Sequence, residues 1–499
     1  MEKRILVWFG VEFTHFSLIH SLQKKLNAKY YAIIDTTNSQ KKFFDNQSLV
    51  KLEQKWYLHD HIKKKYEVDL EYLKDIEKKY ELNLWKMTIN ERIFYRYFNF
   101  HKFERDEILS IEEQILKFYE KILEEIKPDY LIIKLPHLHH QELLIKICRV
   151  KKIRVLMLNT SLIGPGSILM EKTSEYDEKE KFHNTKYNMM SFDECSKILK
   201  GTKQNMTETV VKEKMFEGKL FKLFFNYILS NNKKIETNYD YYGRTKFKVI
   251  TYEINQLFKR IWRKKFIDGN LEKNPDLESS FIYMPLNVDM ERTTLIDAPF
   301  FSNYIETVRS VAKSIPVNSW LFVKEHPAQI MRSWRSTRDY RELLNIPNVV
   351  LIHPDFSNHD LYKNCNLVIT IGGTSGFEAA VYKKPTIILT DLRYDILPSV
   401  ERCKSIEKLP ELIQDSLKKE VDYNDVSKYL YFTKSIISDF NWGRFNRDFN
   451  NTFYPNNNVD VEISEKQLEK FLKEQNDPLD LLADFHIKKM EYFENQKKN

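Results

Sequence analysis

Short apolar runs alternate with amphipathic stretches in the first third of the chain. Runs typical of buried strands occupy residues 4–9, 30–34, 130–134 and 154–159. Stretches with apolar residues at helical spacing lie at residues 15–26, 66–80, 109–126 and 142–150. Alternation of buried strands with amphipathic helices predicts a parallel sheet covered by helices. No GxGxxG sequence follows the first strand, which disfavours a dinucleotide-binding domain.

A second alternating region begins at Ser280. Strands are predicted at residues 280–285, 319–323, 349–352, 367–370 and 386–389. Helices are predicted between them at residues 304–314, 338–344, 359–363 and 377–382. Strands that recur at this spacing are typical of a doubly wound α/β domain.

Residues 171–279 interrupt the alternation. Residues 171–188 carry so much charge that we predict poor order there. An amphipathic helix is predicted at residues 215–229. Residues 247–266 are basic and aromatic, and two interpretations stay open. They form either a helix that packs one face and solvates the other, or a helix that contacts a membrane surface or an acceptor.

The hydrophobic pattern therefore predicts an α/β fold with two Rossmann-like domains and a helical insertion. The predicted parts are an N-terminal domain (1–165), a charged helical insertion or linker (166–279), a C-terminal domain (280–425) and C-terminal helices that pack back (426–499). Within the last part, residues 439–455 look irregular, whereas residues 463–472 and 479–493 read as helices.

Composition narrows the function classes. The net charge of +8 over 499 residues is a mild excess that suits an anionic small substrate or an anionic membrane surface. The basic residues are spread along the chain, which argues against a nucleic-acid partner. The four cysteines (Cys148, Cys195, Cys365, Cys403) are widely separated, so we predict free thiols and no metal site.

The sequence also bears on location. No apolar run approaches the roughly 20 residues that span a bilayer. The first residues, MEKRILVWFGVEF, lack the apolar length and the small-residue cleavage site of a signal peptide. We expect a cytoplasmic protein, with peripheral association at the inner face of the cell membrane as an open possibility.

Three polar turns follow predicted strands of the second domain, at residues 324–327, 353–358 and 372–376. In an open parallel sheet, ligands bind outside the carboxyl ends of the strands, so these turns are expected on one edge. Lys324 and His326 are candidates to meet a phosphate or a ribose, and a capping role for His326 is the alternative. Glu325 is either a surface charge or a sugar ligand.

The glycine-rich turn 372–376 is the most suggestive of the three. Its glycines let the backbone approach a ligand, and it lies at a helix N-terminus, where phosphate binds well. A tight strand-to-helix turn that needs glycine only for geometry is the competing interpretation. Glu378, in the first helical turn, either accepts ribose hydroxyls or complements the helix dipole.

Four segments resemble the C-terminal half of the capsule polysaccharide biosynthesis glycosyltransferases, a family that includes the β-Kdo transferases. They are VKEHP (323–327), NVVLIHP (348–354), VITIGGTSGFEA (368–379) and KPTII (384–388). FIYMPLNVD (281–289) also fits, with Asn287 where many members carry Gln. The resemblance covers residues 280–394, and the N-terminal half matches only in pattern.

The resemblance implies a GT-B fold, with the donor nucleotide on the C-terminal domain and the active site in the cleft. It implies that His326 contacts the nucleotide phosphate and that Thr374 and Ser375 help to hold it. No DxD sequence is placed for this task, so a metal-independent reaction without a cofactor is expected. The expected donor-binding residues are Lys324, Glu325, His326, Pro327, Thr370, Gly372, Gly373, Thr374, Ser375, Gly376 and Glu378.

The catalytic base is expected from the N-terminal domain, across the cleft from the donor. Glu12, directly after the first strand, is the first candidate to deprotonate an acceptor hydroxyl, with His15 and His137 as rivals. Arg332, Arg335 and Arg338 are either ligands for an acidic sugar or part of a solvated helix face.

These features predict a glycosyltransferase that moves a sugar from a nucleotide donor to a surface polysaccharide or glycolipid. A CMP-activated acidic sugar such as Kdo is the expected donor. Two alternatives remain, a CDP-polyol phosphotransferase of the teichoic-acid type and a non-catalytic binding subunit of a glycan synthesis complex.

Overall fold

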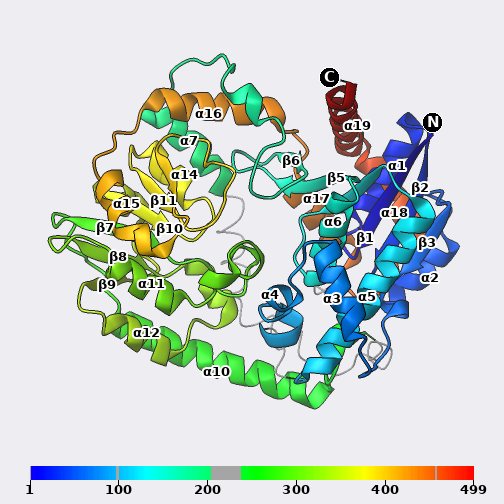
Figure 1. Cartoon of the computed structure of the whole chain (residues 1–499), viewed down its shortest axis with the longest axis horizontal. Helices are drawn as coiled ribbons and strands as arrows, with labels where there is room; N and C mark the ends of the chain where they lie inside the picture. Colours follow the sequence, from blue (N-terminus) through cyan, green and yellow to red (C-terminus); the bar gives the residue numbers. More distant parts are fainter. Residues whose placement is uncertain (1, 97–99, 204–237, 456–457, 499) are drawn as a thin grey trace.

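The computed structural model describes residues 2–96, 100–203, 238–455 and 458–498. The helix predicted at residues 215–229 lies outside the described residues. Two α/β halves lie side by side, joined along one side by a long helix (Figure 1). The fold is α/β with two Rossmann-like domains, as the hydrophobic pattern predicted.

The N-terminal sheet has the strand order β3-β2-β1-β4-β5-β6. All neighbouring strands are parallel except β5 and β6. Its strands are β1 (Lys3–Gly10), β2 (Ala28–Asp35), β3 (Gln54–Tyr57), β4 (Tyr130–Lys134), β5 (Arg154–Thr160) and β6 (Ser167–Met170). The antiparallel edge strand β6 therefore lies just beyond residue 165, where we had predicted the end of the N-terminal domain.

The C-terminal sheet has the order β12-β11-β10-β7-β8-β9, and its neighbouring strands are all parallel. Its strands are β7 (Phe281–Pro285), β8 (Trp320–Lys324), β9 (Val349–Ile352), β10 (Leu367–Thr370), β11 (Thr386–Ile388) and β12 (Val400–Arg402). Counted from its first strand, each sheet has the doubly wound order 3-2-1-4-5-6. The strand order thus reverses between β1 and β4 in one sheet and between β7 and β10 in the other.

Helices cover both faces of each sheet. The helices of the first half are α1 (Thr14–Lys25), α2 (Asn38–Asn46), α3 (Leu70–Lys79), α4 (Leu84–Thr88), α5 (Arg105–Ile126) and α6 (His139–Val150). Those of the second are α11 (Tyr304–Ala312), α12 (Thr337–Leu344), α13 (Asn358–Asn364), α14 (Ser375–Val381), α15 (Leu409–Ser416) and α16 (Tyr423–Ile436). Two-sided burial follows from alternation along the strands: in β1, Val7 and Phe9 face one core, whereas Trp8 faces the other.

The C-terminal helices return to the N-terminal sheet (Figure 1). They are α17 (Trp442–Phe453), α18 (Glu465–Glu474) and α19 (Asn476–Lys498). Helix α17 corrects the prediction of irregular structure at residues 439–455. Phe445, Phe449 and Phe453 recur at helical spacing and are buried, so one apolar face stabilises a helix despite its many asparagines. The Phe449 ring stacks on Phe13, with centroids 5.2 Å apart.

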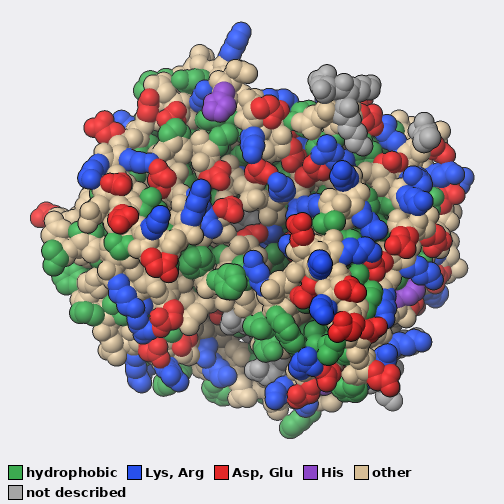
Figure 2. Space-filling view, viewed as in Figure 1, with side chains coloured by type: hydrophobic (Ala, Val, Ile, Leu, Met, Phe, Trp, Pro, Cys, Tyr) green, Lys and Arg blue, Asp and Glu red, His purple; other side chains and the backbone are tan. Residues whose placement is uncertain are grey.

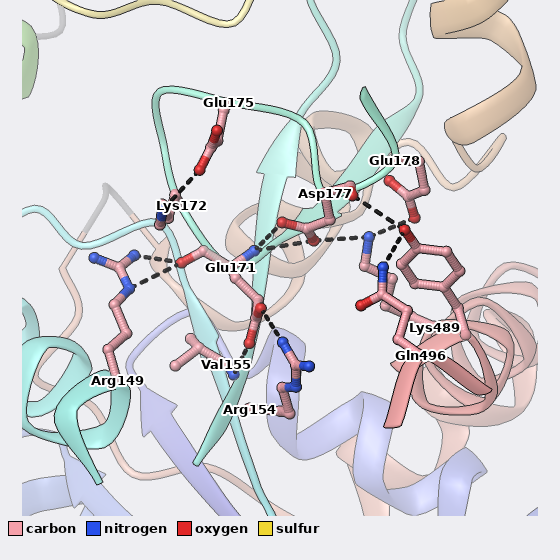
Figure 3. Close-up of polar contacts among 11 residues, drawn as sticks. Arg149, Arg154, Val155, Glu171, Lys172, Glu175, Asp177, Glu178, Lys489 and Gln496 are labelled. Carbon is pink, nitrogen blue, oxygen red and sulfur yellow. Dashed lines mark hydrogen bonds and ion pairs between the residues drawn. The ribbon is translucent and has the colours of Figure 1, made fainter. Parts of the chain in front are cut away.

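The charged segment 171–188 is ordered, contrary to the prediction (Figure 3). Its acidic side chains are paired: Glu171 bonds to Arg154 at 2.6 Å, and Asp177 to the buried Lys489 of α19 at 2.8 Å. Glu178 also bonds to Lys489, at 2.6 Å. High charge predicts disorder only when the charges stay solvated, and here they join the edge of the N-terminal sheet to α19.

Candidate active site

The reversal of strand order in the N-terminal sheet brings Glu12 and Lys134 together. Glu12 follows β1, Lys134 ends β4, and their side chains form an ion pair with a separation of 2.8 Å. The carboxylate folds back over Gly10, where an added Cβ would lie 2.6 Å from Glu12 Oε2. A side chain at position 10 would therefore displace the Glu12 carboxylate from this place.

The ion pair fixes the charge of Glu12. Burial disfavours its carboxylate, but the Lys134 ammonium and its hydrogen bond outweigh burial and hold the pKa of Glu12 below its ordinary value. Glu12 is thus ionised at neutral pH, the state that a general base needs before the reaction. Lys134 was not predicted from the sequence, because a lysine that ends an apolar strand looks like a boundary residue.

His137 lies on the same edge and lines a pocket of about 160 Å³ between the two halves. The pocket is also lined by Arg92, by Lys86 of α4, and by Leu295 and Pro299 from the C-terminal half. Partial removal from water, followed by the positive charges of Lys134, Arg92 and Arg292, lowers the pKa of His137, although part of the residue is exposed to solvent. His137 is therefore a neutral imidazole in a cationic part of the cleft.

His15 has a different environment. It is buried in the first turn of α1, and burial, with His486 and Lys134 nearby, lowers its pKa to about 3 although Glu12 opposes the shift. The structure brings His15 close to Glu12 but encloses it beneath the C-terminal helices. An acceptor hydroxyl would meet Glu12 or His137 more readily than His15.

In the C-terminal sheet the reversal of strand order falls at the glycine-rich turn. Two side chains bond to the carbonyl oxygen of Gly372, Asn287 Nδ2 at 3.0 Å and Thr370 Oγ1 at 2.9 Å. The Tyr394 hydroxyl donates to the carbonyl oxygen of Gly373 at 2.8 Å. The C=O and N–H of a trans peptide point in opposite directions, so the N–H groups of Gly373 and Thr374 are directed away from these partners.

Close packing requires two glycines of the turn, and backbone conformation favours the third. A Cβ at Gly372 would lie 2.4 Å from Thr293 Cγ2, and one at Gly376 would lie 2.8 Å from the Tyr394 ring. Gly373 has φ of +93°, a conformation that favours glycine. These requirements are compatible with ligand contact by the backbone N–H groups of the turn.

The polar side chains of the turn already have protein partners. Thr374 Oγ1 donates to Glu378 Oε1 at 2.7 Å, and Glu378 is buried. Ser375 and Glu378 both interact with the Tyr362 hydroxyl, whose pKa is raised well above its ordinary value mainly by burial. Glu378 thus anchors the turn through its contacts with Thr374 and Tyr362.

Glu325 is neither a surface charge nor part of a solvated patch. Its carboxylate is fully buried and bonds to Arg335 Nε and to the Tyr340 hydroxyl, each at 2.8 Å. Arg335 Nη2 continues to the backbone oxygen of Asn287 at 2.5 Å. This corrects the solvated-face interpretation for Arg335, whereas Arg338 is exposed and pairs with Glu342 at 3.1 Å. The buried pair positions Asn287, which in turn holds Gly372.

His326 and Lys324 end the neighbouring strand. His326 Nδ1 accepts the N–H of Ala328 at 3.1 Å and thereby caps the short helix η7 (Pro327–Arg332). An accepting Nδ1 leaves the ring proton on Nε2, so the cap also fixes the tautomer that can donate to a phosphate. Lys324 is buried and donates to Asn358 Oδ1 on α13.

Figure 2 shows a hollow near the middle of this face of the molecule. Arg292, in the loop after β7, lowers the pKa of His137 by its positive charge and forms a two-bond ion pair with Asp297 of η5 (Thr293–Asp297). Sequence analysis missed Asn287, Arg292 and Lys134 as members of the site. The Leu286–Asn287 position had been noted, but its contact with Gly372 spans 85 residues and has no local signal.

The described residues contain no group of three or more His, Cys, Asp or Glu side chains that could hold a metal ion. Cys148, Cys195, Cys365 and Cys403 are free and buried. No helix among the described residues is long and apolar enough to cross a membrane.

Fold and site together define an α/β protein of the GT-B type, with polar groups on facing edges of two doubly wound sheets. The family model of the capsule polysaccharide biosynthesis proteins matches residues 132–398, which is more than half of the chain. The chain belongs to this family. The match begins in β4 and ends beyond the glycine-rich turn, so it includes Lys134, His137, His326 and the whole glycine-rich turn.

Solved structures show weaker likeness. The UDP-GlcNAc 2-epimerase of Methanocaldococcus jannaschii is 13% identical, with 87% of this chain and 99% of that chain covered and a TM-score of 0.25. KpsC of Thermosulfurimonas dismutans, a beta Kdo 2,7 transferase, is 13% identical, with 71% and 97% covered and a TM-score of 0.28. Because these identities and TM-scores are low, the family assignment rests on the family match alone. Comparison with curated protein sequences found no match.

Proposed function

We propose that the protein is a GT-B glycosyltransferase that transfers a sugar from a nucleotide donor to a surface polysaccharide or glycolipid acceptor. The observation that carries the proposal is the family match, because it spans polar groups at the strand-order reversals of both sheets. A CMP-activated acidic sugar such as Kdo is the proposed donor. This choice rests on the segments that resemble the β-Kdo transferases and on the cationic groups in the cleft.

The donor phosphate would bind at the C-terminal sheet. The N–H groups of Gly373 and Thr374 are directed away from the bonds that hold their turn, and His326 carries its proton on Nε2. These donors are fixed before the ligand arrives, which is the arrangement that stabilises a departing phosphate at least cost. The reaction we propose needs neither a metal ion nor a cofactor.

The acceptor would be activated at the N-terminal sheet. In the proposed step, Glu12 removes the proton from an acceptor hydroxyl whose oxygen attacks the anomeric carbon of the donor sugar. The bond from that carbon to the phosphate oxygen breaks, and the nucleotide leaves with the electron pair. Lys134 keeps Glu12 ionised, and His137 is positioned to bind the acceptor as a neutral donor or acceptor of hydrogen bonds.

Titration of the purified protein with CMP, CDP, UDP and GDP tests the donor site. We expect CMP to bind, and we expect His326→Ala to weaken binding about tenfold, because a hydrogen bond to a charged group contributes about 1.5–3 kcal/mol. His359→Ala is the matched control, since His359 lies at the same edge of the sheet but bonds to Tyr382. Binding of no nucleotide, or equal binding by His326→Ala, would contradict the donor site.

A mass-detected transfer assay tests the chemistry. Glu12→Gln should retain nucleotide binding and lose at least about a hundredfold in transfer rate, the usual contribution of a general base. The mass of the product separates sugar transfer from polyol-phosphate transfer. Unchanged transfer by Glu12→Gln would refute the assignment of the base.

We also propose that the protein works at the inner face of the cell membrane.

A further inference from the structure

Helix α10 (Lys246–Asn270) joins the two halves along the lower edge of the molecule (Figure 1). Its first turns rest on the N-terminal half, where Lys248 Nζ donates to the Phe100 oxygen at 3.0 Å. Its last turns rest on the C-terminal half, where Arg263 donates to the Trp334 oxygen at 2.8 Å and the Phe266 ring stacks on Tyr340. One face of α10 is therefore fixed to the protein at both ends.

The opposite face is apolar and open to solvent. Phe247, Phe258 and Trp262 are 75%, 67% and 62% exposed. The exposed large apolar side chains of the helix are Phe247, Ile254, Leu257, Phe258, Ile261 and Trp262. At 100° per residue they fall within one side of the helix, away from Arg263 and Phe266. Sequence analysis left open a solvated face or a face that contacts a membrane surface or an acceptor, and a solvated face would not carry six large apolar side chains.

Positive charge borders this apolar face. The helix carries seven Lys and Arg residues against two acidic residues, Glu253 and Asp268. Asp268 is already paired with Lys264 and with His353 Nε2, at 3.0 Å from the latter. Lys246, Lys259 and Lys265 are exposed beside the apolar side chains. The outer surface of α10 is thus apolar along its centre, with Lys246 and Lys259 at its two margins and Lys265 at the end of the apolar row.

We infer that the outer face of α10 is an interfacial membrane anchor that binds the surface of an anionic bilayer. The helix would lie in the plane of the interface, with Phe258 and Trp262 among the acyl chains and the lysines at the phosphates. A second copy of the chain is a poorer occupant, because two such faces would bring their cationic margins against each other. This inference deepens the proposed location at the membrane, and it needs none of the transfer chemistry.

Vesicle co-sedimentation of the full-length protein tests the anchor. The probe is a vesicle of equimolar phosphatidylcholine and phosphatidylglycerol, compared with phosphatidylcholine alone. We expect sedimentation with the anionic vesicles only, reduced by added salt. Phe258→Ser with Trp262→Ser should weaken binding about a hundredfold, about tenfold for each lost aromatic side chain. The matched control replaces two exposed apolar residues outside α10, Val317→Ser with Met189→Ser, and should bind as the wild type.

Charge and insertion are tested separately. Lys259→Glu with Lys265→Glu should abolish the preference for anionic vesicles while the apolar face is intact. Trp262 fluorescence should shift to the blue with vesicles, and Trp262→Phe should lose this change while it keeps binding. Absence of vesicle binding by the wild type, or equal binding by the Phe258/Trp262 variant, would overturn the anchor.

Light scattering in the absence of lipid tests whether a second copy of the chain covers this face instead. A dimer that becomes a monomer in the Phe258/Trp262 variant would assign the face to a second copy and overturn the membrane inference. A monomer in both is expected. Nucleotide titration of the same variants separates the two proposals, because loss of the anchor should leave CMP affinity unchanged. A protein that binds vesicles but no nucleotide would retain the anchor and lose the proposed function.

Discussion

Asn287 Nδ2 donates to the carbonyl oxygen of Gly372 across 3.0 Å and ties the end of β7 to the turn that follows β10. The backbone oxygen of Asn287 also accepts a hydrogen bond from Arg335 Nη2. The buried Glu325–Arg335 pair and the glycine-rich turn therefore form one connected structure. The side chain that connects them is neither charged nor catalytic.

Asn287→Ala should weaken nucleotide binding about fivefold, because loss of one neutral hydrogen bond costs about 1 kcal/mol and releases the Gly372 carbonyl. Calorimetric titration with CMP measures the change. Asn366→Ala is the control, since Asn366 Nδ2 bonds to Ser280 Oγ at 2.8 Å at the other end of the strands. An equal loss of affinity in the control would indicate a general weakening of the sheet.

Gly372→Ala should lower nucleotide affinity and lower the free energy of unfolding by about 1–3 kcal/mol, because the new methyl group would overlap Thr293 Cγ2. Thr293→Ser removes that methyl group and should restore part of both quantities in the double variant. Thermal unfolding and CMP titration of the four proteins complete the cycle. No rescue by Thr293→Ser would mean that the backbone conformation of Gly372, rather than the overlap, sets the requirement.

Lys134→Met should raise the pKa of Glu12, because the ammonium that offsets the cost of burial is lost. The acid limb of kcat/KM reflects ionisation of the free enzyme, so it should move to higher pH by about one unit or more. Lys151→Met, at a half-buried lysine that pairs with Glu124 rather than with Glu12, should leave the limb in place. A lower rate with an unmoved limb would exclude Glu12 as the titrating base.

Two buried histidines should make the protein sensitive to acid. Burial lowers the pKa of His15 to about 3 and that of His486 to about 4, from an ordinary value of 6.5. Below pH 6.5 the unfolded chain binds protons that the folded chain excludes. Stability should therefore fall as pH falls, by about 1.4 kcal/mol per unit for each histidine, until the folded-state pKa is reached.

His486→Leu removes one of these groups and should flatten the decline in stability between about pH 6 and about pH 4 by that amount per unit. Urea unfolding at a series of pH values measures the slope. His183→Gln, at an exposed histidine, should leave the slope unchanged. A variant with the wild-type slope would show that His486 is protonated in the folded protein.

Elements with a strong local signal were predictable. The strands at 130–134, 349–352 and 367–370 have the predicted ends, because each is a short apolar run between polar residues or prolines. Helix α17 was missed because its stability comes from Phe449 against α1 rather than from its own composition. Strand β6 was missed because four residues after a Gly-Pro-Gly sequence look like a loop, and only pairing with β5 makes them a strand.

The residues of the site also fall into a group that could be predicted from the sequence and a group that could not. The turns that hold His326 and Gly372 were predictable, because turn residues after apolar strands mark the ligand edge of such a sheet. The partners of these residues were not. The sequence does not show that Arg335 and Tyr340 bury the Glu325 carboxylate. The charge of Glu12 likewise depends on a lysine more than a hundred residues away. Contacts of this kind are set by the sheet order, which has no local pattern.

The return of α17, α18 and α19 to the N-terminal sheet also orders events during synthesis of the chain. Helix α1 completes its packing against α19, which lies about 450 residues further along the chain. One face of the first sheet therefore stays incompletely covered until α19 has been made, although its strands are made much earlier. The second sheet has its covering helices α11–α16 within its own stretch of sequence and can fold earlier. In this protein the half that is synthesised first is the half that is finished last.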